Sequence, residues 1–171
     1  PASAVQELVE NAIDASAKQI DIRTEQGGKA RIAITDDGCG MTREELSLAV
    51  ERHATSKLPD DHDLLRLHHL GFRGEALPSI GAVSRLTLTS RAKGEDNAWS
   101  LGVEGGELSE AAPAALSCGT RVEVRDLFFA TPARLKFLKS DRAETMQIKD
   151  TVQRLAMAHP QVEFSLNTDG K

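Results

Sequence analysis

Cysteine and aromatic residues are scarce in this sequence, and long apolar runs are missing. Cys39 and Cys118 are the only cysteines among 171 residues, they lie far apart, and they form no C-x-x-C pair. This pattern excludes a disulfide framework and a zinc site built on cysteine pairs, and it favours a reducing cytoplasm as the compartment. No apolar run approaches the roughly 20 residues that cross a bilayer, so we expect no membrane association.

Motifs of several familiar active sites are also absent. The sequence has no G-x-x-x-x-G-K-S/T, which excludes a Walker-type phosphate loop, and no G-x-G-x-x-G to support a Rossmann site. No spacing suggests a Ser/His/Asp or Cys/His nucleophile. Four histidines share no metal-ligand spacing, so surface positions are the better interpretation for His62, His68, His69 and His159.

The composition is that of one globular domain. Hydrophobic residues make up 40% and charged residues 27%, with 13 glycines and 6 prolines, which is close to the average for such domains. We therefore expect residues 1–171 to form a single domain. The start Pro1-Ala2-Ser3 has no initiating Met, and the turn signal at 167–170 has no strand after it. We expect the chain to belong to a longer protein that continues at both ends.

Charge is unevenly distributed along the chain. The net charge of −5 repels phosphate backbones overall, but residues 119–142 carry +3 and the remainder −8. If the chain touches nucleic acid, a local patch in this segment must make the contact. Its basic residues are Arg121, Arg125, Arg134, Lys136, Lys139 and Arg142.

Apolar periodicity predicts several helices. Ser3 with Gln6 has the spacing of a capping box for a helix to about Ala17, and Thr42 with Glu45 has the same spacing for a helix to Val50. Further helices are expected at 75–83, after Thr131-Pro132, and at 141–158 with Met146, Val152, Leu155 and Ala156 on its apolar side.

Period-two alternation predicts the strands of a sheet. Segments 20–24 and 30–34, joined by Gln26-Gly-Gly-Lys29, indicate a hairpin. Other strands are expected at 86–88, 98–103, 122–124 and 162–166. Because the elements do not alternate as βαβαβ, we predict an α+β two-layer sandwich, with helices on one face of a mixed, mainly antiparallel sheet.

The first predicted helix carries a polar stripe opposite its apolar face. Glu7, Asn11 and Asp14 are spaced i, i+4 and i+7, so they lie along one side of the helix. A carboxylate can orient and deprotonate water, and an amide oxygen is a suitable ligand for a Mg²⁺ ion that keeps water and phosphate ligands. On spacing alone, a solvated helix face is the simpler interpretation.

A second candidate is the loop Asp36-x-Gly38-x-Gly40, directly after a predicted strand. Glycines let a flat ring approach the backbone, and a carboxylate can accept a hydrogen bond from an exocyclic amine such as that of adenine. Because Asp and Gly also form ordinary turns, the motif alone leaves that alternative open.

Two further loops could bind phosphate. Gly71-Phe-Arg-Gly-Glu75 precedes a predicted helix, whose free backbone N–H groups favour an anion. The run Arg52-His-Ala-Thr-Ser-Lys57 concentrates hydrogen-bond donors. Taken singly, the first could be a mobile connector and the second a basic surface turn.

The order of these motifs resembles the ATPase region of the MutL family of DNA mismatch repair proteins, within the superfamily of gyrase, heat-shock chaperone and histidine kinase ATPases. The first two matching runs mark the superfamily, and the third, the fourth and the Thr-Pro-Ala-Arg run are specific to MutL-like proteins. The runs are Glu7-Leu-Val-Glu-Asn-Ala-Ile-Asp-Ala15, Asp36-Asp-Gly-Cys-Gly-Met41, Arg52-His-Ala-Thr-Ser-Lys57, Gly71-Phe-Arg-Gly-Glu-Ala-Leu77, Gly119-Thr120 and Thr131-Pro-Ala-Arg134.

The resemblance implies a Bergerat-type ATP-binding fold, with ATP and Mg²⁺ as ligands and a role for each motif. Glu7 would be the general base and Asn11 the Mg²⁺ ligand. Asp36 would accept from the adenine amine, with Gly40 allowing close approach and Thr120 completing the pocket. The phosphate-binding residues would be Lys57 and the lid made of Gly71, Phe72, Arg73, Gly74, Glu75, Ala76 and Leu77.

The resemblance also implies how the intact protein works. It would bind and slowly hydrolyse ATP, and its nucleotide state would control dimerisation and engagement of DNA and other repair proteins, in the bacterial cytoplasm near the nucleoid. Two departures affect this expectation: the family's preceding segment and its second domain with a catalytic lysine are absent, and Asp37 stands where relatives often carry Asn. This chain alone should therefore be a nearly inactive monomer. A nucleotide-sensing or DNA-binding adaptor, or another ATPase of the superfamily such as a histidine kinase, remains the alternative.

Overall fold

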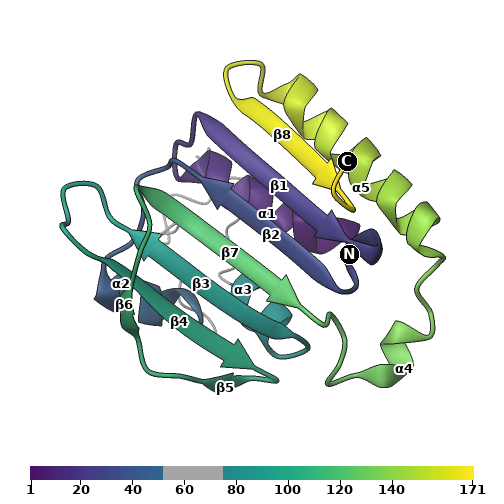
Figure 1. Cartoon of the computed structure of the whole chain (residues 1–171), viewed down its shortest axis with the longest axis horizontal. Coiled ribbons are helices and arrows are strands. Elements are labelled where there is room, and N and C mark those ends of the chain that lie inside the picture. Colours follow the sequence, from purple (N-terminus) through teal and green to yellow (C-terminus); the bar gives the residue numbers. More distant parts are fainter. Residues whose placement is uncertain (52–74) are drawn as a thin grey trace, which may run out of the picture.

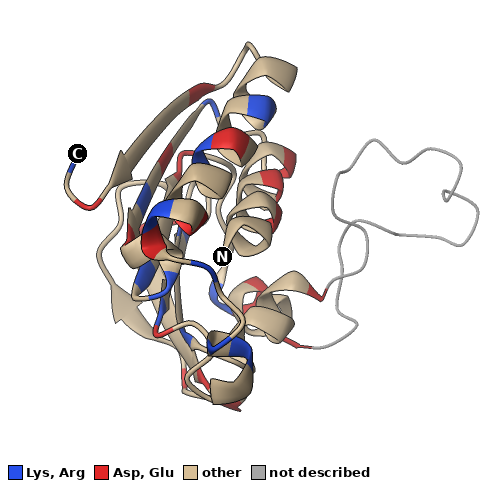
Figure 2. Cartoon of the chain, turned by 90° about the vertical axis from the view of Figure 1, so that its right-hand side faces the viewer, with Lys and Arg blue, Asp and Glu red and all other residues tan. Residues whose placement is uncertain are grey.

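The computed structural model describes residues 1–51 and 75–171 as two layers, a sheet and a set of helices on one of its faces (Figures 1 and 2). The helices are α1 (Ala2–Asp14), α2 (Arg43–Ala49), α3 (Ala76–Gly81), α4 (Pro132–Leu135) and α5 (Asp141–Ala158). A short 3-10 turn, η1 (Gln26–Gly28), joins the first two strands. The expected α+β sandwich is confirmed.

Within the described residues, the sheet has eight strands and is antiparallel at every pairing except one. Its order is β5-β4-β3-β7-β2-β1-β8, with β6 also paired to β4, and only β1 and β8 run parallel. The strands are β1 (Gln19–Glu25), β2 (Arg31–Asp36), β3 (Arg85–Arg91), β4 (Ala98–Glu104), β5 (Glu107–Leu108), β6 (Ala112–Ala114), β7 (Gly119–Arg125) and β8 (Glu163–Thr168). The short strands β5 and β6 have no alternation to reveal them in the sequence.

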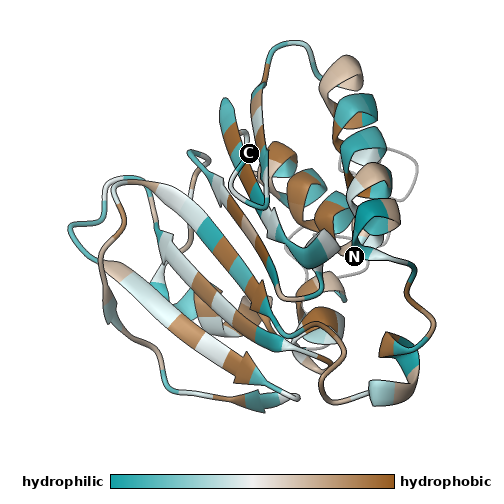
Figure 3. Cartoon of the chain, turned by 45° about the vertical axis from the view of Figure 1, so that its right-hand side comes forward, coloured by the Kyte–Doolittle hydropathy of each residue, from teal (hydrophilic) through white to brown (hydrophobic). Residues whose placement is uncertain are grey.

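The core lies between the helices and the sheet. Successive strand residues point to opposite faces, and Figure 3 shows the resulting alternation of apolar and polar residues along the strands. α1 packs on β2, α2 on β4, α3 on β3, and α5 on both α1 and β8. The fully buried side chains include Val5, Val9, Ile22, Ile34, Leu46, Leu88 and Ile148.

The structure corrects three expectations about the helices. α1 begins at Ala2 with Pro1 as its N-cap, so Ser3 lies inside the first turn and forms no capping box; the Gln6 amide instead donates to Glu10 at 2.8 Å. α3 is shorter than predicted. Met146 is 64% exposed, because α5 turns the side that includes Ile148 and Val152 inward. The Thr42–Glu45 capping box and the bounds of α5 are confirmed.

No helix among residues 1–51 and 75–171 is long and apolar enough to cross a membrane.

Candidate nucleotide-binding site

A row of buried polar residues crosses three neighbouring strands on the helix-facing side of the sheet. Asp36, the last residue of β2, is paired in register with Thr120 of β7, and Thr120 is paired with Ser90 of β3. Their relative exposures are 7%, 8% and 0%. The rest of this face is mostly apolar, so the three side chains form a polar strip at one end of the core. Trp99 of β4 continues the row, with the Arg43 guanidinium 4.8 Å from the centre of its ring.

The Asp36 carboxyl group lies in an environment that disfavours its charge. Burial raises its pKa to about 6, and the neighbouring Asp37 charge adds to the rise, while backbone hydrogen bonds from Gly38 and Thr120 oppose it. The Gly38 N–H donates to Asp36 Oδ1 at 2.9 Å. Above pH 6 the group is therefore a buried carboxylate with remaining capacity to accept a hydrogen bond.

The carboxyl group of Asp37 has a structural role that differs from that of Asp36. Its Oδ1 accepts from the backbone N–H groups of Lys18 at 2.7 Å and Gln19 at 2.9 Å. Partial burial alone would raise the pKa of Asp37, but these hydrogen bonds lower it below its ordinary value. Asp37 therefore anchors the loop to the segment between α1 and β1, while Asp36 faces the core.

The loop after Asp36 is fixed on both sides by backbone contacts. The Cys39 N–H donates to the Ala15 carbonyl and the Lys93 N–H to the Cys39 carbonyl, each at 2.9 Å. Gly40 has φ +68°, and a Cβ there would overlap the backbone carbonyl of Arg91. Close packing of two backbone segments therefore requires glycine at position 40. The sequence did not indicate this reason. The close approach of Gly40 to an adenine ring stays a prediction.

Ser90 joins this loop to the polar row. Its hydroxyl oxygen accepts from the Met41 N–H at 2.8 Å and lies 2.8 Å from the Thr120 hydroxyl and 3.0 Å from the Gly119 carbonyl. Ser90 was not predicted as a site residue from the sequence. The available signal was a polar residue at an inward position in the alternation Leu86, Leu88, Ser90.

The polar stripe of α1 faces away from the buried side of that helix. Glu7 is exposed, and Asn11 and Asp14 are partly buried. The end of α1 reaches the loop after Asp36 through the Ala15–Cys39 hydrogen bond, so the structure joins the helix and the loop that the sequence offered as separate candidates. No cluster of three or more His, Cys, Asp or Glu side chains suited to a metal occurs in the described part of the chain.

The lid is only partly within the described residues. Glu75 is the N-cap of α3, and Ala76 and Leu77 form its first turn; all three are partly buried. The other predicted phosphate-binding residues, Lys57, Gly71, Phe72, Arg73 and Gly74, lie outside the described residues.

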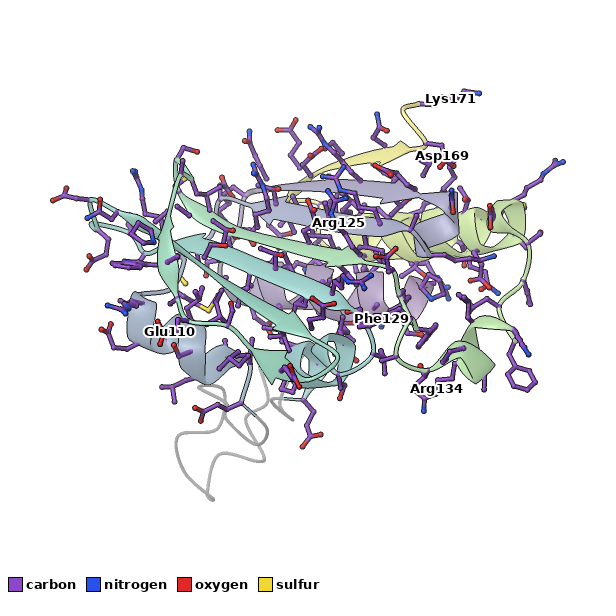
Figure 4. All side chains as sticks on the ribbon, turned by 60° about the horizontal axis from the view of Figure 1, so that its bottom comes forward. Glu110, Arg125, Phe129, Arg134, Asp169 and Lys171 are labelled. Carbon is purple, nitrogen blue, oxygen red and sulfur yellow. The ribbon has the colours of Figure 1, made fainter. Side chains whose placement is uncertain are left out.

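The basic segment 119–142 does not form one continuous patch. Arg125 on β7 pairs with Glu123, and Arg121 donates to Thr35. Figure 4 shows Arg125 over the sheet and Arg134 on α4, at different places in the molecule. Exposed basic residues that form no ion pair with the described acids gather along α4, the residues that connect it to α5, and the first turn of α5; they are Arg134, Lys136, Lys139 and Arg142.

The site combines the buried Asp36 carboxyl group, the neighbouring Thr120 hydroxyl, the glycine loop after Asp36 and the polar stripe of α1. This combination of groups fits a nucleotide-binding ATPase. The family described as "Histidine kinase-, DNA gyrase B-, and HSP90-like ATPase" matches residues 1–116, and the chain belongs to this family. Within it, the chain corresponds to the ATPase domain of MutL DNA mismatch repair proteins.

The individual comparisons support this assignment. The DNA mismatch repair protein MutL of Rhodopseudomonas palustris strain HaA2 is 69% identical over 166 residues, 97% of this chain and 28% of that protein. MutL of Paramagnetospirillum magneticum is 64% identical over 171 residues, 100% of this chain and 28% of that protein. A structure described as "Aquifex aeolicus MutL ATPase domain complexed with ADP" is 32% identical with a TM-score of 0.78, covering 99% of this chain and 60% of that one. The chain thus spans little more than a quarter of the length of the two MutL proteins.

Proposed function

We propose that this chain binds ATP with Mg²⁺, and that Asp36 selects the base by accepting a hydrogen bond from the exocyclic amine of adenine. The observation that carries this proposal is the buried Asp36 carboxyl group, whose pKa is raised to about 6 beside the Thr120 hydroxyl. A carboxyl group whose charged form is disfavoured by burial in this way is typical of a ligand-binding site. The similarity to an Aquifex aeolicus MutL ATPase domain complexed with ADP supports an adenine nucleotide as the ligand.

The phosphate end of the nucleotide would lie toward the polar stripe of α1. We assign Asn11 as the protein ligand of Mg²⁺ and Glu7 as the base that orients and deprotonates the attacking water. A divalent ion held by one amide oxygen, by water and by phosphate oxygens needs no protein cluster of acids. Bound Mg²⁺ would neutralise charge on the phosphates, and Lys57 and the lid residues Gly71 to Leu77 would contact the same phosphates.

For the whole protein we propose slow ATP hydrolysis that controls dimerisation and engagement of DNA and other repair proteins. Phosphoryl transfer depends mainly on positioning and charge stabilisation, so segments beyond this chain would supply the rest of the site. The exposed basic residues around Arg134 are the proposed nucleic-acid contact of this domain, weak on its own. We place the intact protein in the bacterial cytoplasm, near the nucleoid.

The base-selection step is tested by calorimetry with non-hydrolysable ATP and GTP analogues and Mg²⁺. Guanine has a carbonyl where adenine has its amine, so a carboxylate facing it is repulsive; a charge-assisted hydrogen bond of about 1.5–3 kcal/mol predicts at least roughly tenfold tighter ATP binding. Asp36→Asn should remove most of this preference.

Asp37→Asn is the matched control. It changes the adjacent carboxylate, whose Oδ1 accepts from the backbone N–H groups of Lys18 and Gln19, and should keep the preference for ATP. Equal affinity of the unchanged protein for both analogues, or loss of the preference in Asp37→Asn alone, would refute the assignment of Asp36.

A further inference from the structure

We propose that Ser90 is a positioning residue for purine selection, which sets the direction of the Thr120 hydroxyl beside Asp36. The inference rests on the proposed adenine site and adds a residue that does not touch the nucleotide. Ser90 is fully buried and is paired in register with Thr120 across β3 and β7. Its hydroxyl lies 2.8 Å from that of Thr120.

The hydrogen bonds around Ser90 leave two proton arrangements. A serine hydroxyl has one proton to donate and two lone pairs. One lone pair of Ser90 is taken by the Met41 N–H at 2.8 Å. In the first arrangement, the Ser90 proton goes to the Gly119 carbonyl at 3.0 Å, and Thr120 donates to Ser90. In the second arrangement, the Ser90 proton goes to the Thr120 oxygen. Only the second arrangement leaves the Thr120 proton free for a ligand.

The two arrangements suit different bases. On its base-pairing edge, adenine presents a donor, the amine, next to an acceptor, the ring nitrogen, whereas guanine presents a carbonyl acceptor next to an N–H donor. Asp36 is an acceptor in its charged form and Thr120 is its neighbour in the row. A site with Asp36 accepting and Thr120 donating, directly or through a water, is complementary to adenine. Ser90 supports that pattern when its proton turns from the Gly119 carbonyl to the Thr120 oxygen.

Ser90 also holds the glycine loop against the sheet. Its bond to the Met41 N–H fixes the residue after Gly40, whose backbone packs against Arg91. Removing the hydroxyl would leave the Met41 N–H and the Thr120 hydroxyl without this partner. Both effects act at the base end of the site.

The chain offers a matched control one residue away. Thr89 and Ser100 form a hydroxyl pair at 2.9 Å between β3 and β4, and this pair is only partly buried. Because successive strand residues point to opposite faces, the pair lies on the other side of the sheet from Ser90. Thr89→Ala removes a bond of the same chemistry without touching the polar row.

The experiment measures the ratio of ATP-analogue to GTP-analogue affinity for Ser90→Ala, Ser90→Thr, Thr89→Ala, Thr120→Val and the double variant Ser90→Ala/Thr120→Val. We expect Ser90→Ala to lower the ratio of ATP-analogue to GTP-analogue affinity by about three- to tenfold, mainly because ATP-analogue binding becomes weaker. This factor corresponds to the loss of one neutral hydrogen bond. Ser90→Thr keeps the hydroxyl and should restore the ratio. If Ser90 acts through Thr120, the double variant should discriminate no worse than Thr120→Val alone.

The outcomes separate this inference from the function on which it rests. Equal ATP and GTP affinity in the unchanged protein would overturn both. An ATP preference in Ser90→Ala that equals that of the unchanged protein would overturn the role of Ser90 and leave Asp36 standing. A ratio that narrows equally in Thr89→Ala, or additive losses in the double variant, would also overturn it. Should Ser90→Ala be too unstable to titrate, Thr120→Val and Ser90→Thr probe the same hydroxyl pair. The proposal is supported if Thr120→Val loses the preference for ATP and Ser90→Thr keeps it. It is refuted if Thr120→Val keeps the preference and Ser90→Thr loses it.

Discussion

Replacing Asp36 with Asn should make the nucleotide-free protein more stable at neutral pH, although it removes the residue that we assign to adenine. The pKa of Asp36 rises from 3.8 to about 6 on folding, chiefly because of burial. At about 1.36 kcal/mol per pKa unit, this shift corresponds to roughly 3 kcal/mol of destabilisation when the carboxyl is charged. Asn keeps an oxygen for the Gly38 N–H and has no charge to desolvate, but its amide also needs a partner. Because an unpartnered amide donor offsets about 1 kcal/mol or more of this relief, we expect a net gain of about 1–2 kcal/mol.

The sign of the pH dependence follows from the direction of the shift. The folded carboxyl holds its proton up to about pH 6, whereas the unfolded one releases it near 3.8. The contribution of Asp36 to stability is fully present below the lower value and is lost as the pH rises through the higher one. The advantage of Asp36→Asn should thus be largest above pH 6 and disappear near pH 4.

Urea unfolding followed by the fluorescence of Trp99, the single tryptophan, measures this difference at about pH 8 and about pH 4. Asp37→Asn is the internal control, because the pKa of Asp37 is lowered and its loss should destabilise the protein at the higher pH. No gain from Asp36→Asn at about pH 8, or the same gain at both pH values, would refute the reasoning.

Three other predictions follow from the same contacts. ATP-analogue affinity should fall as the pH drops through about 6, because protonation converts Asp36 from a charged acceptor into a weaker, neutral one that also carries a donor; calorimetry that shows flat affinity across this range would count against its role. Gly40→Ala should destabilise the protein by more than about 1 kcal/mol in urea unfolding, since its Cβ would meet the Arg91 carbonyl at positive φ; an unchanged midpoint would be inconsistent with the loop geometry. Steady-state hydrolysis by this chain should be at least about 10²-fold slower than by a protein that continues into the segments its relatives carry, at equal nucleotide saturation; equal rates would show that those segments are not needed.

The sequence predicted most of what depends on local pattern. Strand alternation placed β3 and β7 correctly, and the Thr42–Glu45 spacing located the start of α2. The same kind of evidence was wrong for Ser3, because a capping box depends on where the helix begins and Pro1 takes the N-cap position. It was wrong for Met146 because only tertiary packing decides which side of α5 is buried.

The polar row could be predicted only in part. Asp36 was proposed from its glycine loop and favoured by the resemblance, and Thr120 was identified through the resemblance alone. Their pairing depends on the register of β2 and β7, which no local pattern specifies. Ser90 was missed for the same reason, since its partners come from β7 and from the loop after β2. The reason for Gly40 was also missed, because a close approach of two backbones leaves no trace beyond the glycine itself.

The central claim, an ATPase site that joins Asp36 to Glu7, is tested most directly by Glu7→Gln in the longer protein, with nucleotide binding and turnover measured on the same sample. Glu10→Gln is the matched control, because Glu10 lies on the same helix and contacts Gln6. We predict that Glu7→Gln binds the ATP analogue within about twofold of the unchanged protein and loses at least about 10²-fold in turnover, as expected for removal of a general base, while Glu10→Gln keeps both. Retained turnover in Glu7→Gln, or a loss of binding equal to the loss of turnover, would contradict the account.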